Sequence, residues 1–470
     1  MTLTLDRSPR SVARRLEEAA RGRAEGTLVS ISEPVASPQP LALHAAARHM
    51  GASLWLQPAS GFGLVGIGAA WTARAGVGAD RFAVVSQAWR ALLAKAAVDD
   101  RQQLPRGVGP VLLGGFSFDA QPRASSVWQG FEPACLVLPA LLLTWTLDDA
   151  WLTLSWRVGT SPGPAALLRT WQELAGAARS GAPVADDATS APSRLRVTRH
   201  RPEAPAWRDS VARLAGAVGR GRLDKAVLAR RVDLRAADDI DVPAVLRRLA
   251  ASAPESTLFA VARGDRTFVG ATPERLVSLR GRELRTMAMA GSTHRSGDVA
   301  SDDALALELM RSDKEREEHA VVVTMLRESL GPLVERLDVG PRPEIVRLRH
   351  VQHLVTPVTG RLWGEATVLD LVARLHPTPA VGGTPRELAL ELIAEEEPIE
   401  RGWYAGPLGW LDRHGDGEFV VALRSGVVRG REASLFAGCG IVADSAPERE
   451  WDESSAKLLA LGSALGRIEP

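Results

Sequence analysis

The stretch GWYAGPLGWLDRHGDGEFVVALRS, residues 402–425, has the pattern of a β-hairpin. Two runs rich in Trp, Val and Phe flank a polar segment, and its Asp416-Gly417 pair is typical of a tight turn. The hairpin carries Tyr404, the only tyrosine of the chain, on one arm and Arg424 on the other. Further hairpin patterns occur along the chain, so we predict an α+β fold rather than a regular parallel βαβ arrangement.

The composition excludes several classes of function. The 470 residues include 57 Lys and Arg against 56 Asp and Glu, so no net field attracts nucleic acid or an anionic membrane. With 45% hydrophobic residues the chain can bury a core and is not disordered. Cys135 and Cys439 are too few for a disulfide framework. The N-terminus lacks a signal peptide pattern and no apolar run spans a bilayer, so we expect a cytoplasmic protein.

A segment rich in Pro, Ala, Ser and Asp is predicted to be a linker or loop at residues 181–196. It separates residues 1–180, with short strand-like runs, from residues 197–470, where the patterns are stronger. Within the first part, GFGLVG at residues 61–66 fits the GxGxxG pattern of dinucleotide-binding folds. The next acid, Asp80, follows Gly66 by only 14 residues instead of about 20, so we interpret this segment as a glycine-rich strand.

One lysine is predicted to lie on an apolar strand face. In LDKAVLARRVDL, residues 223–234, strand alternation puts Lys225 on the same face as Leu223, Val227 and Ala229. Burial disfavours the charged ammonium, so such a lysine can serve as a base. The alternative is a lysine at a strand end whose ammonium reaches water.

The next candidates lie in and after ATPERLVSLRGRELRT, residues 271–286. Glu274 precedes a predicted hairpin that turns at Arg280 and Gly281, and it is either an acid or a charge at a strand edge. The AGST string that follows contains Ser292 and Thr293, whose polar groups could donate hydrogen bonds to a carboxylate. Runs of this composition are more often simple turns.

A long helix is predicted from about Asp302 to Leu330. Its apolar stripe includes Val322, and Glu318 lies one turn before it on the same side, so this carboxylate should point inward. An inward carboxylate needs a cation, a proton or a hydrogen-bond donor. The charged residues 313–317 are interpreted as a solvated face with i, i+4 pairs.

The last helix repeats this pattern after a predicted capping box at residues 445–448. Glu450, Glu453 and Lys457 fall on the same side as Leu461. Glutamates from two helices suit Mg²⁺, which takes one or two protein carboxylates, although two structural salt bridges would explain them equally well. The nine histidines show no spacing typical of zinc.

Between these helices, HPTPAVGGTPRELALELI at residues 376–393 combines a Pro- and Gly-rich loop with a second predicted capping box at residues 384–387. A loop that ends at a helix N-terminus is suited to holding anions. Arg424, on the predicted VVALR strand, has apolar neighbours and cannot lose its charge. We therefore expect it to meet a carboxylate from the substrate or from the protein.

Together these strings resemble the chorismate-utilising enzymes, and within them the isochorismate synthases of the menaquinone pathway. The matching strings are GGFSFD, KAVLAR, ATPERL, AGST, EEH, HPTPAVGG, GWYAGPLGW, ALRSG, FAGCGIV and EWDESSAK. The resemblance implies an α+β fold in which large antiparallel sheets pack face to face with helices outside, and it makes residues 197–470 the chorismate-binding domain. It also implies Mg²⁺-dependent isomerisation of chorismate to isochorismate by a chain that needs no glutaminase subunit.

The resemblance assigns roles to the candidate residues. Lys225 corresponds to the base that activates water, and Glu274 to the acid that protonates the departing hydroxyl. Glu318 and Glu453 correspond to the Mg²⁺ ligands. The positions that correspond to substrate-binding residues are Ser292, Thr293, Ala380, Tyr404, Arg424, Gly438 and Lys457, with Glu450 and His376 in the layer around them.

Other functions stay open. A salicylate synthase would form isochorismate and then eliminate pyruvate, and an isochorismate synthase could also serve a siderophore pathway. Amino-transferring relatives are disfavoured, because Lys225 is present and Ala290 stands where aminodeoxychorismate synthases have a nucleophilic lysine. Outside catalysis, the chain could be a small-anion-binding module, which would bind its ligand without turnover.

Overall fold

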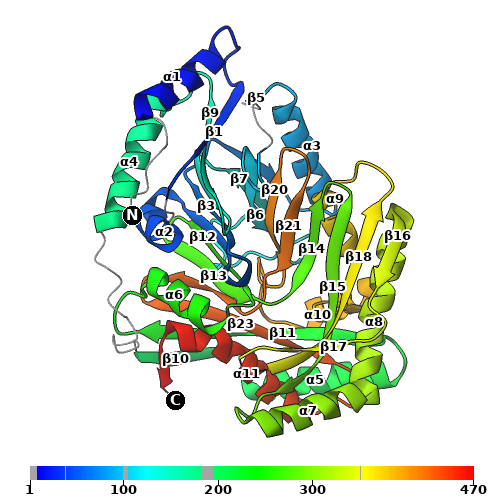
Figure 1. Cartoon of the computed structure of the whole chain (residues 1–470). Helices are drawn as coiled ribbons and strands as arrows, with labels where there is room; N and C mark the ends of the chain where they lie inside the picture. Colours follow the sequence, from blue (N-terminus) through cyan, green and yellow to red (C-terminus); the bar gives the residue numbers. More distant parts are fainter. Residues whose placement is uncertain (1–7, 37–38, 99–103, 181–193, 350, 470) are drawn as a thin grey trace.

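The computed structural model describes residues 8–36, 39–98, 104–180, 194–349 and 351–469. The strands among these residues form two large sheets that pack face to face (Figure 1). The first sheet has 14 strands. In spatial order they are β24 (Arg467–Glu469), β10 (Arg194–Arg201), β11 (Lys225–Ala236), β23 (Glu432–Ile441), β22 (Ser425–Arg429), β13 (Arg266–Thr272), β12 (Thr257–Arg263), β2 (Ser53–Gln57), β3 (Phe62–Ile67), β8 (Leu141–Trp145), β9 (Ala150–Arg157), β1 (Leu28–Pro34) and β5 (Ala97–Val98), with β19 (Gly383–Thr384) beside β11.

The second sheet has 10 strands. Their order is β16 (Val334–Val339), β18 (Val351–Leu362), β15 (Glu283–His294), β14 (Arg275–Arg280), β21 (Gly417–Val421), β20 (Pro407–Asp412), β6 (Val111–Phe116), β7 (Ala134–Leu138) and β4 (Trp71–Ala75), with β17 (Glu344–Arg347) beside β18. Pairing is antiparallel throughout, except for β5 and β24 at the two ends of the first sheet. The predicted hairpin at residues 402–425 is β20 and β21, and it lies in the middle of the second sheet.

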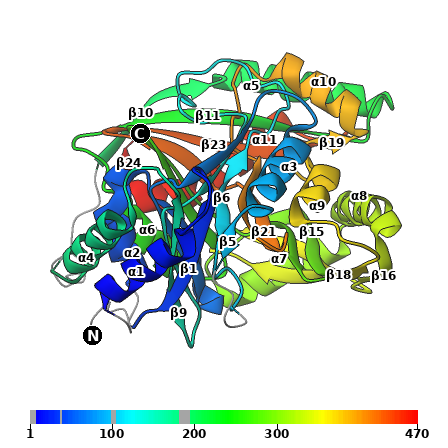
Figure 2. The same ribbon diagram turned by 90° about the horizontal axis from the view of Figure 1, so that it is seen from above.

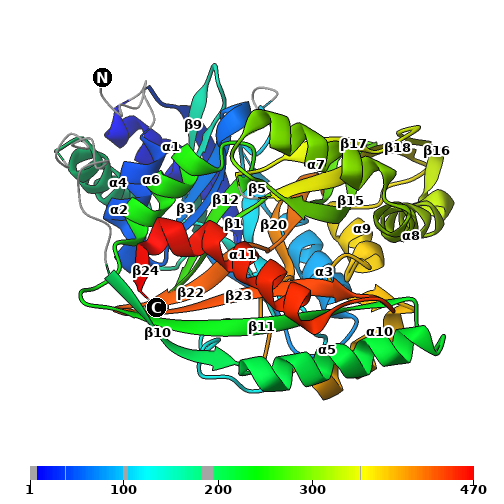
Figure 3. The same ribbon diagram turned by 90° about the horizontal axis from the view of Figure 1, so that it is seen from below.

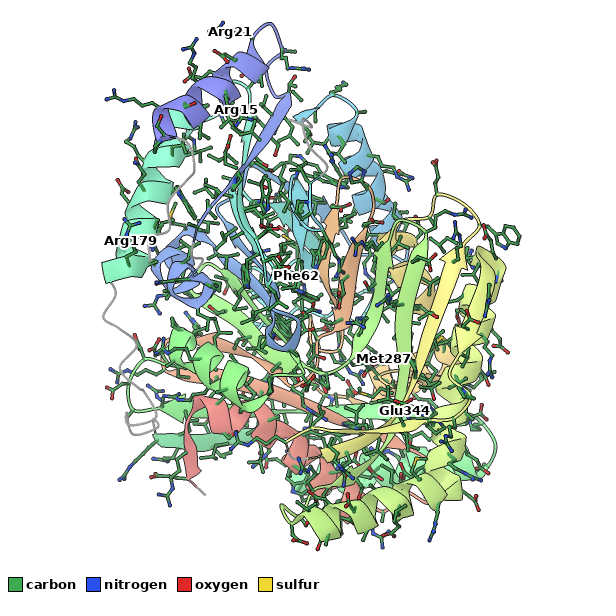
Figure 4. All side chains as sticks on the ribbon, viewed as in Figure 1. Arg15, Arg21, Phe62, Arg179, Met287 and Glu344 are labelled. Carbon is green, nitrogen blue, oxygen red and sulfur yellow. The ribbon has the colours of Figure 1, made fainter. Side chains whose placement is uncertain are left out.

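Aromatic side chains fill the space between the sheets. Phe62 from the first sheet and Trp410 from the second have ring centroids 5.7 Å apart, and Figure 4 shows Phe62 in the interior of the molecule. The helices lie outside. They are α1 (Pro9–Ala20), α2 (Pro40–Ala47), α3 (Arg81–Leu93), α4 (Pro164–Ser180), α5 (Ala204–Gly219), α6 (Val242–Ser252), α7 (Val299–Arg311), α8 (Asp313–Leu330), α9 (Val368–Leu375), α10 (Arg386–Glu396) and α11 (Pro447–Leu465). The α+β fold with face-to-face antiparallel sheets is confirmed.

Each sheet combines strands from both stretches of the chain. Leu56 of β2 pairs with Leu258 of β12 in the first sheet, and Gly114 of β6 pairs with Gly409 of β20 in the second. Of the linker predicted at 181–196, residues 181–193 lie outside the described residues, and the last three belong to β10. Residues 1–180 therefore complete both sheets of the larger C-terminal part, as Figure 2 shows from above.

The glycine-rich segment is a strand, as interpreted. It forms β3, which is buried along its whole length between β2 and β8. A Cβ atom added at Gly63 would lie 2.1 Å from a ring carbon of Trp145, so packing requires glycine there. No helix follows β3 directly, as a dinucleotide-binding fold would require.

Three predictions about helices are wrong. The long helix is interrupted at Ser312, whose extended backbone separates α7 from α8 and whose hydroxyl accepts from the Glu315 amide at 3.3 Å, as an N-cap does. The box at 445–448 fails because the Ser445 hydroxyl accepts from the Val442 amide instead. The box at 384–387 fails because Thr384 belongs to β19. No helix in the described part of the chain is long and apolar enough to cross a membrane.

Candidate active site

A pocket with an empty volume of about 950 Å³ lies where the two sheets meet. Strands β11 and β23 of the first sheet, β15 and β18 of the second, and helices α8 and α11 contribute to its walls. Figure 3 shows α11 lying beside β23. All the predicted site residues line this pocket except Thr293 and His376. Segments up to about 230 residues apart in sequence, from Lys225 to Lys457, thus contribute to one cavity.

Lys225 is the first residue of β11, and its side chain is only 4% exposed. It lines the pocket together with Val227 and Ala229, which confirms the predicted strand face. Its Nζ contacts Oε1 of Glu318 instead of reaching water, so the solvent-exposed alternative is wrong. Gly440 leaves the space that the lysine occupies, because a Cβ there would lie 2.5 Å from Lys225 Cε.

Glu274 lies between β13 and β14 and is buried in the pocket wall. Two hydrogen bonds hold its backbone. The Glu274 carbonyl accepts from the Val421 amide at 3.0 Å, and the Glu274 amide donates to the Thr272 hydroxyl at 3.3 Å. Burial raises the pKa of Glu274 to about 7, against the opposing effect of Lys225, Arg424 and other cations. Near neutral pH a substantial fraction of this carboxyl group is therefore protonated.

Two glutamates from different helices face the pocket as predicted. Glu318 on α8 is in contact with Lys225, and Glu453 on α11 accepts from Lys457 Nζ at 2.6 Å. Burial works to raise the pKa of Glu453, but the Lys457 ammonium holds it below its usual value. Both side chains thus offer carboxylate oxygens of the kind that Mg²⁺ prefers, and Glu450 adds a third carboxyl group at the pocket wall. Among the described residues, no three such side chains already surround one point.

Arg424 lies in the connection by which the chain leaves β21 of the second sheet for β22 of the first. It is not on a strand, which corrects the prediction, and its backbone has a φ of +50°, in the left-handed region that few arginines adopt. Within the described residues its guanidinium makes no hydrogen bond or ion pair. Glu453 and Glu274 interact with it electrostatically but accept no hydrogen bond from it, so its donor groups are available to a carboxylate of a ligand.

Tyr404 forms a further part of the wall, in the turn before β20. Its ring stacks on Phe436 with centroids 5.3 Å apart, and burial raises its pKa to about 12, so the phenol stays neutral. Ala380 and Gly438 also line the pocket. Lys457 donates to the Gly438 carbonyl at 3.0 Å, which fixes α11 against β23.

Two predicted residues lie outside the pocket lining. Thr293 continues β15 and pairs with Gln352 of β18. His376 is buried behind the Pro- and Gly-rich loop, where its Nε2 lies 3.0 Å from the Phe118 carbonyl. The N-terminus of α10 is likewise outside the lining, so the loop contributes Ala380 and Val381 rather than a helix terminus.

Among the pocket residues that the sequence prediction missed, three have acidic or basic side chains. Glu315, interpreted as part of a solvated face, accepts from the Ser292 amide at 3.0 Å through Oε2. His353 on β18 is buried, and burial lowers its pKa to about 3, with help from Arg424 and Lys457. Its position in VQHLV, with Val351 and Val355 on the same strand face, was an available signal. Arg401 gave no such signal of a place at the pocket, because the Val227 carbonyl to which it donates is 174 positions away in sequence.

Comparisons with known proteins agree with this geometry. Residues 14–466 match the family model of the chorismate binding enzyme. The chain is 33% identical to the isochorismate synthase MenF of Bacillus subtilis over 99% of both chains. It is 38% identical to the salicylate biosynthesis isochorismate synthase of Pseudomonas aeruginosa, over 84% of this chain and 81% of that one. The structure of MenF, the menaquinone-specific isochorismate synthase from Escherichia coli, matches with a TM-score of 0.77 at 28% identity, covering 98% of this chain and 100% of that one. The chain belongs to the chorismate-binding enzyme family.

Proposed function

We propose that this protein is an enzyme that isomerises chorismate to isochorismate. The proposal depends most on one observation: Lys225 and the partly protonated Glu274 face the same buried pocket as the unpaired guanidinium of Arg424. A base, an acid and a cation for an anionic substrate are thus present together. The full-length similarity to proteins named as isochorismate synthases supports the same reaction.

The residues supply a balanced reaction. Chorismate carries two carboxylates, and Arg424 can bind one of them in a bidentate manner. Lys225 removes a proton from the water that attacks C2. Glu274 gives its proton to the C4 hydroxyl, which leaves as water while the double bonds shift. One water enters and one leaves, so the product is an isomer of the substrate.

We also propose that Glu318 and Glu453 bind Mg²⁺, with Glu450 close by. Their carboxylate oxygens suit a hard cation, and the pocket that they face is the one that would hold a dianion. When bound, the metal would offset negative charge as the hydroxyl departs. The protein residues then hold the ring in place, with Tyr404 and Ala380 at the walls.

The pathway is the part of the proposal with the least support from geometry. Similarity along the whole chain to the menaquinone-type relatives favours the first committed step of menaquinone formation. The Pseudomonas relative, named for salicylate biosynthesis, is also called an isochorismate synthase. The alternative pathway therefore changes the fate of the product and leaves the proposed reaction the same.

The decisive test is to incubate the purified protein with chorismate and Mg²⁺ and to separate the products by chromatography. An equilibrium mixture of chorismate and isochorismate is expected. Stoichiometric pyruvate and salicylate at neutral pH would instead identify a salicylate synthase. Binding of chorismate without any product would favour the anion-binding module.

A further inference from the structure

Strand β11, which begins with Lys225, lacks a neighbouring strand along part of one edge. On that side β19 pairs with Lys225 and Ala226, and β10 pairs with β11 only from Arg231 onward. The opposite edge is paired with β23 along almost its whole length. Residues 227–230 of β11 therefore have no strand on this edge. Because these residues are buried, their backbone groups on this side need hydrogen bonds from elsewhere.

The Val227 amide donates to the Gly382 carbonyl at 2.7 Å, and two side chains from the segment after α10 supply two further bonds. Arg401 Nη2 donates to the Val227 carbonyl at 2.7 Å, and Glu397 Oε1 accepts from the Ala229 amide at 2.6 Å. The two side chains also bind each other, with Arg401 Nε donating to Glu397 Oε2 at 2.8 Å. The Arg401 side chain is only 2% exposed and the Glu397 side chain only 3%. This Glu397–Arg401 pair takes the place of a missing strand beside the lysine-bearing strand.

The same arginine reaches two other walls of the pocket. Its Nη1 donates to the Val381 carbonyl at 2.8 Å, next to Ala380. Its own carbonyl accepts from the Tyr404 amide at 2.9 Å. Its guanidinium lies 4.1 Å from the centre of the Phe118 ring, which belongs to the GGFSFD string. Arg401 thus connects three segments: its side chain binds those that carry Lys225 and Ala380, and its own backbone belongs to the turn that carries Tyr404.

The charge of the pair has no evident stabilising purpose. A buried ion pair can often be replaced by apolar residues of similar volume without loss of stability. Burial works to lower the pKa of Arg401, but the Glu397 carboxylate holds it above its usual value, so the guanidinium stays charged. What the pair offers beyond an apolar contact is a rigid set of directed hydrogen bonds to the pocket walls.

We propose that Glu397 and Arg401 are positioning residues, which hold the Lys225 strand in place relative to the Ala380 loop and the Tyr404 turn. Neither residue takes part in proton transfer. The inference rests on the proposed function, because it assigns the pair a purpose in that reaction. A misplacement of about 1 Å in a reacting group can cost about a hundredfold in rate.

The test is the double variant Glu397→Leu/Arg401→Met, which removes both charges and leaves neither unpaired. The matched control is Arg15→Met/Glu33→Leu, which makes the same changes in an ion pair whose side chains are 15% and 4% exposed. Figure 4 shows Arg15 on α1, far from Met287 on β15. We expect kcat of the first variant to fall about tenfold or more, with the Kd for chorismate within about threefold, because the groups are misplaced while binding contacts remain. The control should keep the kcat of the unchanged protein.

Hydrogen exchange gives a readout that is independent of turnover. Peptides covering residues 225–231 and 377–383 should exchange faster in the first variant only, because the Ala229 amide loses its acceptor and the Val227 and Val381 carbonyls lose the donor that holds their segments in place. Unchanged exchange and unchanged kcat would overturn the inference, and so would an equal loss of kcat in the control. If the double variant does not fold, Arg401→Lys tests the same inference, and we expect a smaller fall in kcat. If the unchanged protein does not isomerise chorismate, the proposed function fails while the exchange data still test the pair.

Discussion

Two regions of the first sheet, called here the apolar end (strands β3 and β8) and the charged end (strand β11), bury different kinds of side chain. Within β3 and β8 every buried residue is apolar or glycine except Thr144, which donates its hydroxyl to the Gly107 carbonyl. Around β11, Lys225 and Arg230 are 4% and 1% exposed, and Arg401 lies alongside at 2%. Burying a charge costs free energy unless it is paired and hydrogen-bonded. We infer that the charged end is kept for chemistry and that the apolar end holds the two sheets together.

The largest expected effect is at the charged end. Lys225→Ala and Glu274→Gln should each lower kcat by about a hundredfold to ten-thousandfold, because each removes one proton-transfer group. Chorismate should still bind, since Arg424 remains. Initial rates and calorimetric titration measure the two quantities. Lys95→Ala, an exposed lysine after α3, is the control, and normal turnover in either site variant would contradict the mechanism.

Arg424→Gln should act mainly on binding. The unpaired guanidinium contributes to substrate affinity, so KM should rise by about tenfold to a hundredfold, which corresponds to about 1.5–3 kcal/mol for a hydrogen bond to a charged group. Thermal stability should stay the same or increase, because the change removes a buried charge that makes no hydrogen bond or ion pair with the described residues. A destabilised variant with unchanged KM would mean that Arg424 is structural.

Glu453→Gln tests the proposed metal site. Loss of one ionised ligand should raise the Mg²⁺ concentration that gives half-maximal activity by about tenfold or more. Glu448→Gln, on the first turn of the same helix and outside the pocket lining, is the matched control. The two titrations should diverge. If both variants required the same Mg²⁺ concentration, Glu453 would not bind the metal, and its role would be limited to the ion pair with Lys457.

Several parts of this site could be predicted from the sequence, and others could not. Strand alternation correctly placed Lys225, Val227 and Ala229 on one face, because that periodicity is a local property. The crossing between sheets at Arg424 has no local signature. Nor has the Arg401 bond to Val227, which joins residues 174 positions apart. Such contacts depend on how distant segments pack, and a pattern within one segment does not contain that information.

The pKa of Glu274 predicts a specific pH dependence. Because its folded value is about 7 and its ordinary value 4.5, the folded state binds more protons between these values, and stability should fall as pH rises through them. The shift corresponds to about 3 kcal/mol above pH 7, since each pKa unit is about 1.4 kcal/mol. Glu274→Gln should lose this dependence and be more stable than the unchanged protein at pH 8. Denaturant titrations at pH 5 and pH 8 measure the free energy of unfolding of each protein. If that free energy changed equally with pH in the unchanged protein and in Glu274→Gln, a buried carboxyl group at this position would be contradicted.

At the apolar end, substitutions should change stability and leave the chemistry intact. Gly63→Ala puts a Cβ within 2.1 Å of the Trp145 ring, so the indole must move within a packed core, at a cost of about 1–3 kcal/mol. Gly163→Ala is the control, since a Cβ there meets no atom within 4 Å. We expect a lower unfolding midpoint for Gly63→Ala alone, with kcat and KM unchanged below that midpoint. A loss of kcat in the folded variant would show that the apolar end also positions the pocket, and the contrast between the two ends of the sheet would then be wrong.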